Sequence, residues 1–237
     1  MQSGPGIVLE VQLDGAAWVA CPSGIFPQPG QYLAAWTPAD SLHPLPYLLF
    51  PGGLTWLAEQ EQKPLDRPGR TLRFATPLPA WEAGTILQLR GPLGQGFHMP
   101  KDVRRLLLVA LGPHTERLLP LVQPVLEGGG GVALFTDASL PQLPLSVEAY
   151  PLESLPEFRG WPDYIALDLP VEKLSGLRKH FGLGAHAVLG IPAQALVTLP
   201  MPCTAIGDCG ACTVEGRFSN YLACKDGPVF DLGRLAW

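Results

Sequence analysis

Residues 105–111, which read Arg-Leu-Leu-Leu-Val-Ala-Leu, are the stretch that decides the fold. A continuous apolar run of this length is typical of a strand that is buried on both faces of a sheet. A helix-length segment follows at 116–127 and ends in four glycines, and residues 132–135 form a second apolar strand. Further elements of the same kind are a strand at 164–167 and a helix at 174–181. The alternation of strands and helices predicts a small parallel α/β domain.

On the N-terminal side of this domain, the pattern changes to short strand-like runs separated by proline and glycine. Examples are residues 7–13, 47–50 and 85–89. Regularly spaced short strands with turn signals predict an antiparallel β-barrel or a sandwich. We therefore expect such a β-domain at 1–98, an α/β domain at 99–195 and a short C-terminal segment at 196–237. The last segment is too small to bury a core of its own, so it must depend on the rest of the chain or on a metal.

The composition limits the classes of function. Of the 237 residues, 47% are hydrophobic and only 16% are charged, compared with about 25% charged in a typical soluble domain. This deficit suggests that another protein covers part of the surface. A net charge of −5 does not favour a nucleic-acid partner.

The location of the protein can also be predicted from patterns that the sequence lacks. No apolar run reaches the length of about 18 residues that a membrane helix needs, so we expect no membrane span. The N-terminal residues do not form a signal peptide, which predicts a cytoplasmic protein. Thiols stay reduced in the cytoplasm, where clustered cysteines indicate a metal rather than disulfides.

Four of the five cysteines lie in the C-terminal segment, at Cys203, Cys209, Cys212 and Cys224. Plant-type ferredoxins hold a [2Fe–2S] cluster with the pattern C-x4-C-x2-C and one distant cysteine. Here the first gap is five residues, and the rest of the pattern agrees. Small residues in the loop, Gly207, Gly210 and Ala211, would let the backbone approach the cluster and point N–H groups at its sulfurs. The spacing therefore predicts a [2Fe–2S] cluster, which carries electrons.

Two other interpretations of the cysteines remain open. A structural zinc site usually takes its ligands from two C-x2-C knuckles, and only one such pair occurs here. Disulfides would require an oxidising compartment. The fifth cysteine, Cys21, lies far away in the sequence and is interpreted as a small hydrophobic residue.

With these residues identified, the chain resembles the electron-transfer subunit of two-subunit dihydroorotate dehydrogenases, within the ferredoxin reductase-like group. The resemblance depends mainly on Cys-Gly-Ala-Cys at 209–212 and Cys-Lys-Asp-Gly-Pro-Val-Phe-Asp at 224–231. Residues 91–97 and 106–110 also match the family. The resemblance implies a barrel that binds FAD, an α/β domain that binds NADH and a C-terminal cluster domain. It further implies electron flow to FMN in a partner dehydrogenase subunit of pyrimidine biosynthesis, in a hetero-oligomer with two subunits of each kind.

The flavin motif of the family is altered in this chain. The family contacts the flavin with an Arg-Pro-Leu/Phe-Ser stretch, whereas residues 43–46 here read His-Pro-Leu-Pro. Histidine offers fewer donors than arginine and no permanent charge, and the second proline has neither a hydroxyl nor an N–H. Residues 69–71, Gly-Arg-Thr, match the family's phosphate contact or form a plain surface turn. The candidate flavin contacts are His43, Leu45, Gly69 and Thr71, and FAD binding stays open.

The nicotinamide motif departs further. The family has a Gly-Gly-x-Gly-x-x-Pro loop after its first nucleotide strand, and residues 111–117 here read Leu-Gly-Pro-His-Thr-Glu-Arg. Glu116 would place a negative charge near the pyrophosphate, which opposes binding. A later Cys-Gly-Pro of the family is replaced by Leu-Asp-Leu at 167–169. We therefore expect NAD(P)H binding to be weak or absent.

Two function hypotheses follow. In the first, the chain is a redox subunit that passes electrons to or from a partner flavoenzyme and is not catalytic alone. In the second, it is a non-redox interaction or regulatory subunit derived from a reductase, with a structural metal at the cysteines. The C-terminal tail, residues 232–237, either helps to dock the partner or packs on its own chain.

Overall fold

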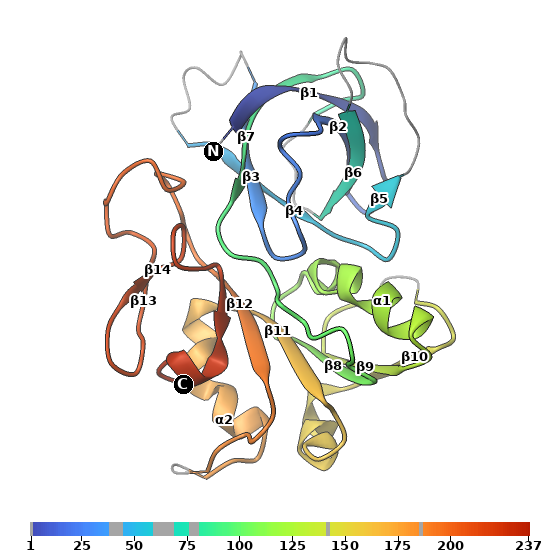
Figure 1. Ribbon diagram of the computed structural model, residues 1–237, viewed down its shortest axis with the longest axis vertical. Helices are drawn as coiled ribbons and strands as arrows, with labels where there is room; N and C mark the ends of the chain where they lie inside the picture. Colours follow the sequence, from blue (N-terminus) through green and yellow to red (C-terminus); the bar gives the residue numbers. More distant parts are fainter. Residues whose placement is uncertain (1, 38–44, 59–68, 76–80, 141–142, 185–186) are drawn as a thin grey trace.

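The structure is a computed structural model that describes residues 2–37, 45–58, 69–75, 81–140, 143–184 and 187–237. A β-barrel and an α/β sheet lie one above the other in Figure 1, and the C-terminal segment runs along the side of both. The predicted fold class is therefore confirmed.

The barrel is a seven-stranded antiparallel sheet in the order β2-β1-β7-β3-β4-β6-β5, and an additional pairing of β2 with β6 closes it. Its strands are β1 (Gln2–Val11), β2 (Ala17–Pro22), β3 (Tyr32–Trp36), β4 (Tyr47–Pro51), β5 (Leu57–Ala58), β6 (Gly69–Ala75) and β7 (Ile86–Leu93). Side chains of β7 alternate between outside and inside, as the two-residue period of a strand requires. The inward side chains, such as Leu87 and Leu89, pack with Leu33, Leu72 and Phe74 in a core from which water is excluded.

The α/β sheet has six strands in the order β10-β9-β8-β11-β12-β15. These are β8 (Arg105–Ala110), β9 (Gly131–Thr136), β10 (Val147–Tyr150), β11 (Tyr164–Pro170), β12 (Ala193–Thr198) and β15 (Val229–Asp231). All neighbouring pairs are parallel except β12 with β15. The apolar runs that predicted buried strands lie in β8, β9 and β11, and five of the six residues of β8 are buried.

The two predicted helices are shorter than expected. The segment 116–127 consists of the 3₁₀ turns η2 (Thr115–Arg117) and η3 (Leu119–Leu121), followed by α1 (Val122–Glu127). Pro120 and Pro124 explain the difference, because proline lacks an N–H and favours the first turn of a helix over its interior. In the second segment, η5 (Val171–Gly176) precedes α2 (Leu177–His180). A further 3₁₀ helix is η4 (Leu152–Phe158).

The C-terminal segment has little regular structure of its own. It contains the small hairpin β13 (Thr213–Val214) and β14 (Tyr221–Leu222), then β15 and η6 (Leu232–Arg234). Strand β15 joins the α/β sheet, and the backbone N–H of Gln95 donates to Gly227 O at 2.5 Å, which ties the segment to the barrel. The tail packs on its own chain: the Trp237 indole donates to Leu232 O, and the Arg178 guanidinium lies over its ring. As expected, the segment depends on both neighbouring domains.

Among the described residues, no helix has the length and apolar character that crossing a bilayer would require.

Candidate iron–sulfur centre

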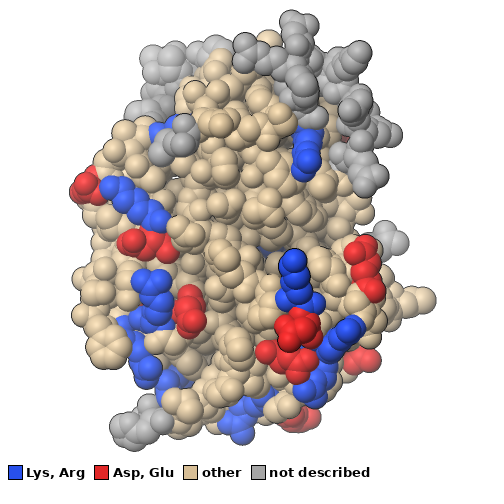
Figure 2. All heavy atoms as spheres, viewed as in Figure 1, with Lys and Arg blue, Asp and Glu red and all other residues tan. Residues whose placement is uncertain are grey.

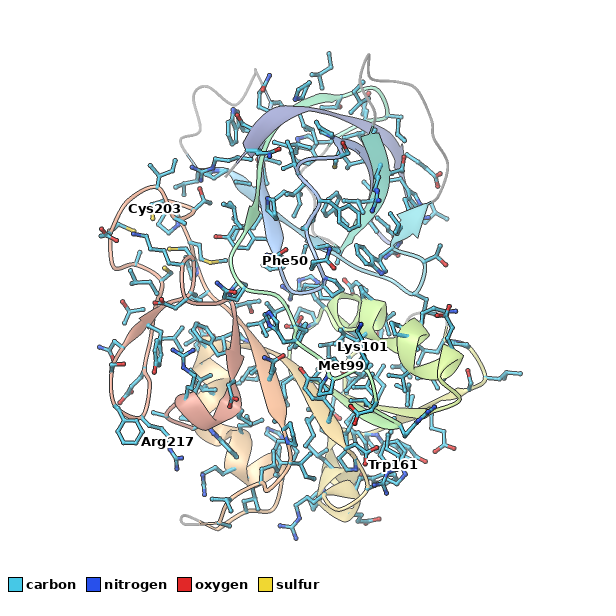
Figure 3. All side chains as sticks on the ribbon, viewed as in Figure 1. Phe50, Met99, Lys101, Trp161, Cys203 and Arg217 are labelled. Atoms are coloured by element: carbon cyan, nitrogen blue, oxygen red, sulfur yellow. The ribbon has the colours of Figure 1, made fainter. Side chains whose placement is uncertain are left out.

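The structure brings the four C-terminal cysteines together as two pairs. The sulfur atoms of Cys212 and Cys224 lie 3.2 Å apart, and both side chains are buried. The Cys203 thiol donates to Gly207 O at 3.4 Å and interacts with the thiol of Cys209, which is exposed. Cys203 also interacts electrostatically with Cys224, so the two pairs are neighbours. In Figure 3, Cys203 lies where the C-terminal segment meets the barrel.

The pairing agrees with a two-iron centre. In a [2Fe–2S] cluster held by four cysteines, each iron takes two thiolates. A structural zinc site would instead place four ligands around one ion at about 2.3 Å. Within the described part of the chain, no three His, Cys, Asp or Glu side chains, the four cysteines included, are arranged as ligands of one metal ion, so the choice between iron and zinc rests on the pairing and the sequence spacing. The 3.2 Å separation of Cys212 from Cys224 is also far longer than the roughly 2.05 Å of a disulfide bond, and all five cysteines are free thiols.

The backbone around Cys203 is folded into tight turns. Thr204 and Ala205 have φ angles of 43° and 67°, in the left-handed region that residues other than glycine rarely adopt. Backbone hydrogen bonds hold this turn: Thr204 N–H donates to Met201 O at 3.1 Å, and Ile206 N–H donates to Cys203 O at 2.9 Å. Strain of this kind persists only where the surroundings impose it and is concentrated at functional sites. The chain therefore turns sharply directly after Cys203, which fixes the position of this cysteine in the loop.

The two pairs differ in their electrostatic surroundings. Backbone hydrogen bonding at Gly207 lowers the pKa of the Cys203 thiol to about 7. Burial, followed by the hydrogen bond with Cys212, raises the pKa of Cys224 to about 12. A metal binds thiolates, so binding at the buried pair must release protons.

Two buried polar atoms lie next to the cysteines without a hydrogen-bond partner among the described residues. They are the hydroxyl of Tyr32 and Nε of Arg90, both from the barrel. Both residues interact electrostatically with Cys203. Buried donors are normally satisfied, so two unsatisfied donors beside four thiols fit a site that receives an anionic group.

The structure describes three of the four candidate flavin contacts. His43 lies outside the described part of the chain, and Leu45 is 57% exposed. Gly69 and Thr71 do not form a surface turn: they belong to strand β6, where Thr71 is buried and pairs with Ala20. The surface-turn interpretation is wrong because β6 is paired on both sides in the barrel. The flavin contacts stay a prediction.

Near the carboxyl end of β11, a buried acid lies beside the end of β8, with Asp168 paired to Ala110. Asp168 is 1% exposed, and its Oδ2 lies 2.9 Å from Nε of Arg117. The two groups are in ion-pair contact, but neither carboxylate oxygen has a well-aligned hydrogen bond from a described residue. Burial raises the pKa of Asp168 to about 6, against the opposing effect of Arg117. The Arg117 guanidinium also lies over Phe50 of the barrel, at the junction of the two domains (Figure 3).

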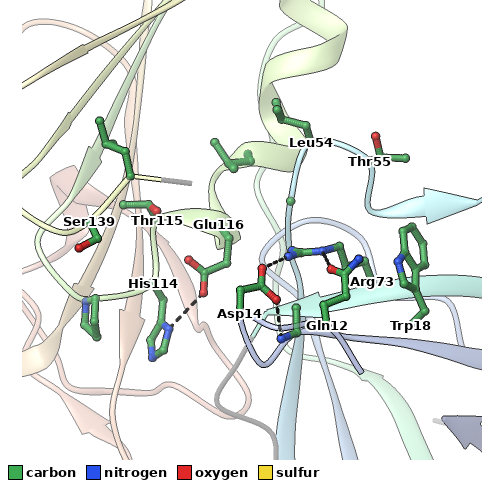
Figure 4. A pocket seen from close by; sticks show the side chains of 15 residues that line it. Gln12, Asp14, Trp18, Leu54, Thr55, Arg73, His114, Thr115, Glu116 and Ser139 are labelled. Carbon is green, nitrogen blue, oxygen red and sulfur yellow. Dashed lines mark hydrogen bonds and ion pairs between the residues drawn. The ribbon is translucent and has the colours of Figure 1, made fainter. Parts of the chain in front are cut away.

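A cleft of about 660 Å³ lies next to this junction, between the barrel and the loop after β8 (Figure 4). Arg73 lines the cleft from the barrel. Its guanidinium donates to Gln12 and to the carbonyl of Gly52 and forms an ion pair with Asp14. On the other wall, His114 Nδ1 lies 3.2 Å from Glu116. The cleft therefore presents carboxylates and an occupied arginine, which do not suit a pyrophosphate.

Sequence reasoning missed Arg90, Tyr32, Arg117 and Phe50. Asp168 did carry a signal, because a charged residue within an apolar strand requires a buried partner. The other four residues carry no signal in the local sequence, since their partners come from distant segments.

The comparison with known structures places the fold. The chain is similar to NADH-dependent reduced ferredoxin-NADP oxidoreductase, a structure described in connection with flavin-based electron bifurcation. The identity is 17% over 98% of this chain and 90% of that chain, with a TM-score of 0.66. It is similar to the cytochrome P450 reductase GcoB of Amycolatopsis at 18% identity, over 83% of this chain and 70% of that chain, with a TM-score of 0.54. It is also similar to a ferredoxin reductase in carbazole 1,9a-dioxygenase at 15% identity, over 77% of this chain and 66% of that chain, with a TM-score of 0.50. At such identities, the likeness establishes the fold.

The chain thus has a ferredoxin reductase-like fold, with four cysteines in its C-terminal segment. Residues 201–236 match the family model described as the iron–sulfur cluster binding domain of dihydroorotate dehydrogenase B. This match confirms the predicted resemblance for the C-terminal segment, and the solved structures agree with it in the fold of the whole chain. The comparison with curated proteins found no match.

Proposed function

We propose that this chain is an electron-transfer subunit in which Cys203, Cys209, Cys212 and Cys224 hold a [2Fe–2S] cluster. The observation that carries the proposal is the arrangement of these thiols in two pairs, within the segment that matches the iron–sulfur family model. When bound, such a cluster supplies a carrier for single electrons.

The chain's residues give this site one closed side and one open side. Cys212 and Cys224 are 1% and 2% exposed and pack in the hydrophobic core that contains the strands of the α/β sheet, which excludes water from their side. Cys209 is exposed, and Ile206 in the same loop is 75% exposed. An electron partner can therefore approach the open side, close to Cys209.

The proposed partner is a flavin-containing dehydrogenase subunit resembling dihydroorotate dehydrogenase, in a cytoplasmic hetero-oligomer. The low charge content supports a covered surface. On the face shown in Figure 2, charged side chains gather over the α/β domain and the C-terminal segment and are sparse over the described part of the barrel. Pyrimidine biosynthesis is the pathway that the family resemblance implies.

We further propose that the chain does not oxidise NAD(P)H itself. Glu116 carries a carboxylate in the loop after β8, where the resemblance places the nucleotide loop, and negative charge there opposes a pyrophosphate. Asp168 lies on β11, where the resemblance places the family's Cys-Gly-Pro, and it fills that position with a buried ion contact to Arg117. FAD on His43, Leu45, Gly69 and Thr71 stays a prediction that extraction of the purified protein can test.

A potentiometric titration followed by electron paramagnetic resonance tests the proposal. The purified full chain should show a reversible one-electron signal on reduction with dithionite. Cys209→Ser should lose this signal, while the matched control Cys21→Ala, a buried cysteine of the barrel, should keep it. A colourless protein with one zinc per chain would overturn the redox proposal and favour the non-redox interaction subunit.

A further inference from the structure

Two barrel side chains extend toward the cysteines from adjacent strands. Tyr32 lies on β3 and Arg90 on β7, and the two strands pair with Tyr32 opposite Leu93 and Ala34 opposite Arg90. Both residues therefore lie near the end of the barrel that faces the C-terminal segment. Their positions are fixed by the sheet and do not depend on the cysteine loop.

Tyr32 places a buried hydroxyl in the core that also contains Cys212 and Cys224. The residue is completely buried, and its ring packs against Phe50 at a centroid distance of 5.5 Å. The hydroxyl has no hydrogen-bond partner among the described residues and interacts electrostatically with Cys224, Cys212 and Cys203. Burying a hydroxyl without a partner is costly, so this hydroxyl is well suited to donate to an acceptor bound at the cysteines.

Arg90 holds the strained part of the cysteine loop. Its guanidinium donates to the carbonyl of Thr204 at 2.7 Å and also contacts the Thr204 hydroxyl. Thr204 is 1% exposed and is one of the two residues with left-handed backbone in this loop. Nε of Arg90 is buried and lacks a partner in the described structure. The side chain thus brings a permanent positive charge next to Cys203 and leaves one donor free.

We propose that Tyr32 and Arg90 are positioning residues for the cluster, through which the barrel sets its reduction potential. This inference rests on the proposed [2Fe–2S] site. Tyr32 donates its hydroxyl to a thiolate of the buried Cys212 and Cys224 pair. Arg90 fixes the turn after Cys203 and stabilises added negative charge by its own positive charge. Hydrogen bonds to cluster sulfurs and nearby charge are the means by which a protein tunes such a potential.

The first test separates the tyrosine hydroxyl from the tyrosine ring. Tyr32→Phe keeps the packing against Phe50 and removes only the donor. In the metal-free chain, this variant should unfold at the same temperature as the wild type or a higher one, because the hydroxyl has no partner there. In the loaded chain, its midpoint potential should fall. Tyr164→Phe is the matched control, because the Tyr164 hydroxyl is already bound to Gln194, and it should not change the potential.

The second test separates the charge of Arg90 from its shape. Arg90→Gln should lower the midpoint potential by about 59 mV. For a one-electron couple, this shift is a tenfold decrease in the ratio of reduced to oxidised protein at a fixed potential. Arg90→Lys keeps the charge and loses the fork, so its potential should lie between those of the glutamine variant and the wild type. Arg73→Gln, which removes a charge elsewhere on the barrel, should leave the potential unchanged.

The outcomes distinguish this inference from the proposed function. If the wild type binds no cluster, the proposed function fails first. If all variants bind the cluster and Tyr32→Phe and Arg90→Gln keep the wild-type potential, the cluster assignment holds and the role of the two barrel residues is refuted. Equal shifts in Arg90→Gln and Arg90→Lys would refute the role of the arginine charge.

Discussion

Replacing Asp168 with asparagine should remove a penalty that the folded protein carries at neutral pH. Asp168 is buried at the junction of the barrel and the α/β domain, and burial raises its pKa from an ordinary value of 3.8 to about 6. A raised pKa means that the folded state binds the proton more tightly than the unfolded state does. The contribution of this group to stability is therefore fully present below pH 4 and is lost as the pH rises through 6.

The magnitude follows from the shift of the pKa. A shift of about two units corresponds to about 3 kcal/mol over the whole titration, since each unit is worth about 1.4 kcal/mol. About 2 kcal/mol of this falls between pH 4 and pH 7.5. The free energy of unfolding of Asp168→Asn minus that of the wild type should therefore grow by about 2 kcal/mol across this range. Loss of the ion contact with Arg117 changes the free energy of unfolding of Asp168→Asn by a further amount, so the prediction concerns how the difference changes with pH and not its absolute value.

Urea unfolding at a series of pH values measures this difference, because effects of other groups cancel between the two proteins. Asp163→Asn is a control of opposite sign. The hydrogen bond from the Arg105 side chain lowers the pKa of the half-buried Asp163, so this carboxylate contributes stability at neutral pH and loses it on acidification. A difference for Asp168→Asn that is flat, or that shrinks as the pH rises, would show that Arg117 keeps Asp168 ionised and would refute the reasoning.

Two further predictions concern the site and the nucleotide loop. Cys209→Ser should lose the cluster and become sensitive to protease between residues 201 and 226, because bound metal takes the place of a core there. Strand β15 should stay protected, because it pairs with β12. A C-terminal segment that resists protease fully would contradict this prediction. NADH added without oxygen should not reduce the loaded chain, because the carboxylate of Glu116 in the loop after β8 opposes the pyrophosphate. Bleaching of the visible absorbance by NADH would show that the loop still binds the nucleotide.

Parts of the fold that depend on local pattern could be predicted from the sequence. The run at 105–111 indicated a strand buried on both faces, because only a fully covered strand tolerates continuous apolar residues, and β8 occupies it. The helix at 116–127 was predicted too long, because Pro120 and Pro124 limit it to short turns and one short α-helix. Gly69 and Thr71 were interpreted as a flavin phosphate contact or as a surface turn, and their pairing in β6 rules out the turn and leaves the flavin contact a prediction.

The candidate site likewise has features that the local sequence predicts and features that depend on distant parts of the chain. The spacing of the four cysteines predicted a common centre, because residues close in sequence must converge within one loop. It did not predict that Cys212 pairs with Cys224 and Cys203 with Cys209, since that depends on how the hairpin of β13 and β14 returns the chain. Arg90 and Thr204 are 114 positions apart, and only the docking of the segment against the barrel brings them together.

The central claim is that four thiolates hold two irons and two sulfides, and chemical analysis tests it most directly. Iron and acid-labile sulfide should be measured in the full chain purified without oxygen, alongside Cys209→Ser and Cys21→Ala. The account predicts two irons and two sulfides per chain in the wild type and in Cys21→Ala, and neither in Cys209→Ser. Zinc without sulfide, or the same iron content in Cys209→Ser as in the wild type, would contradict it.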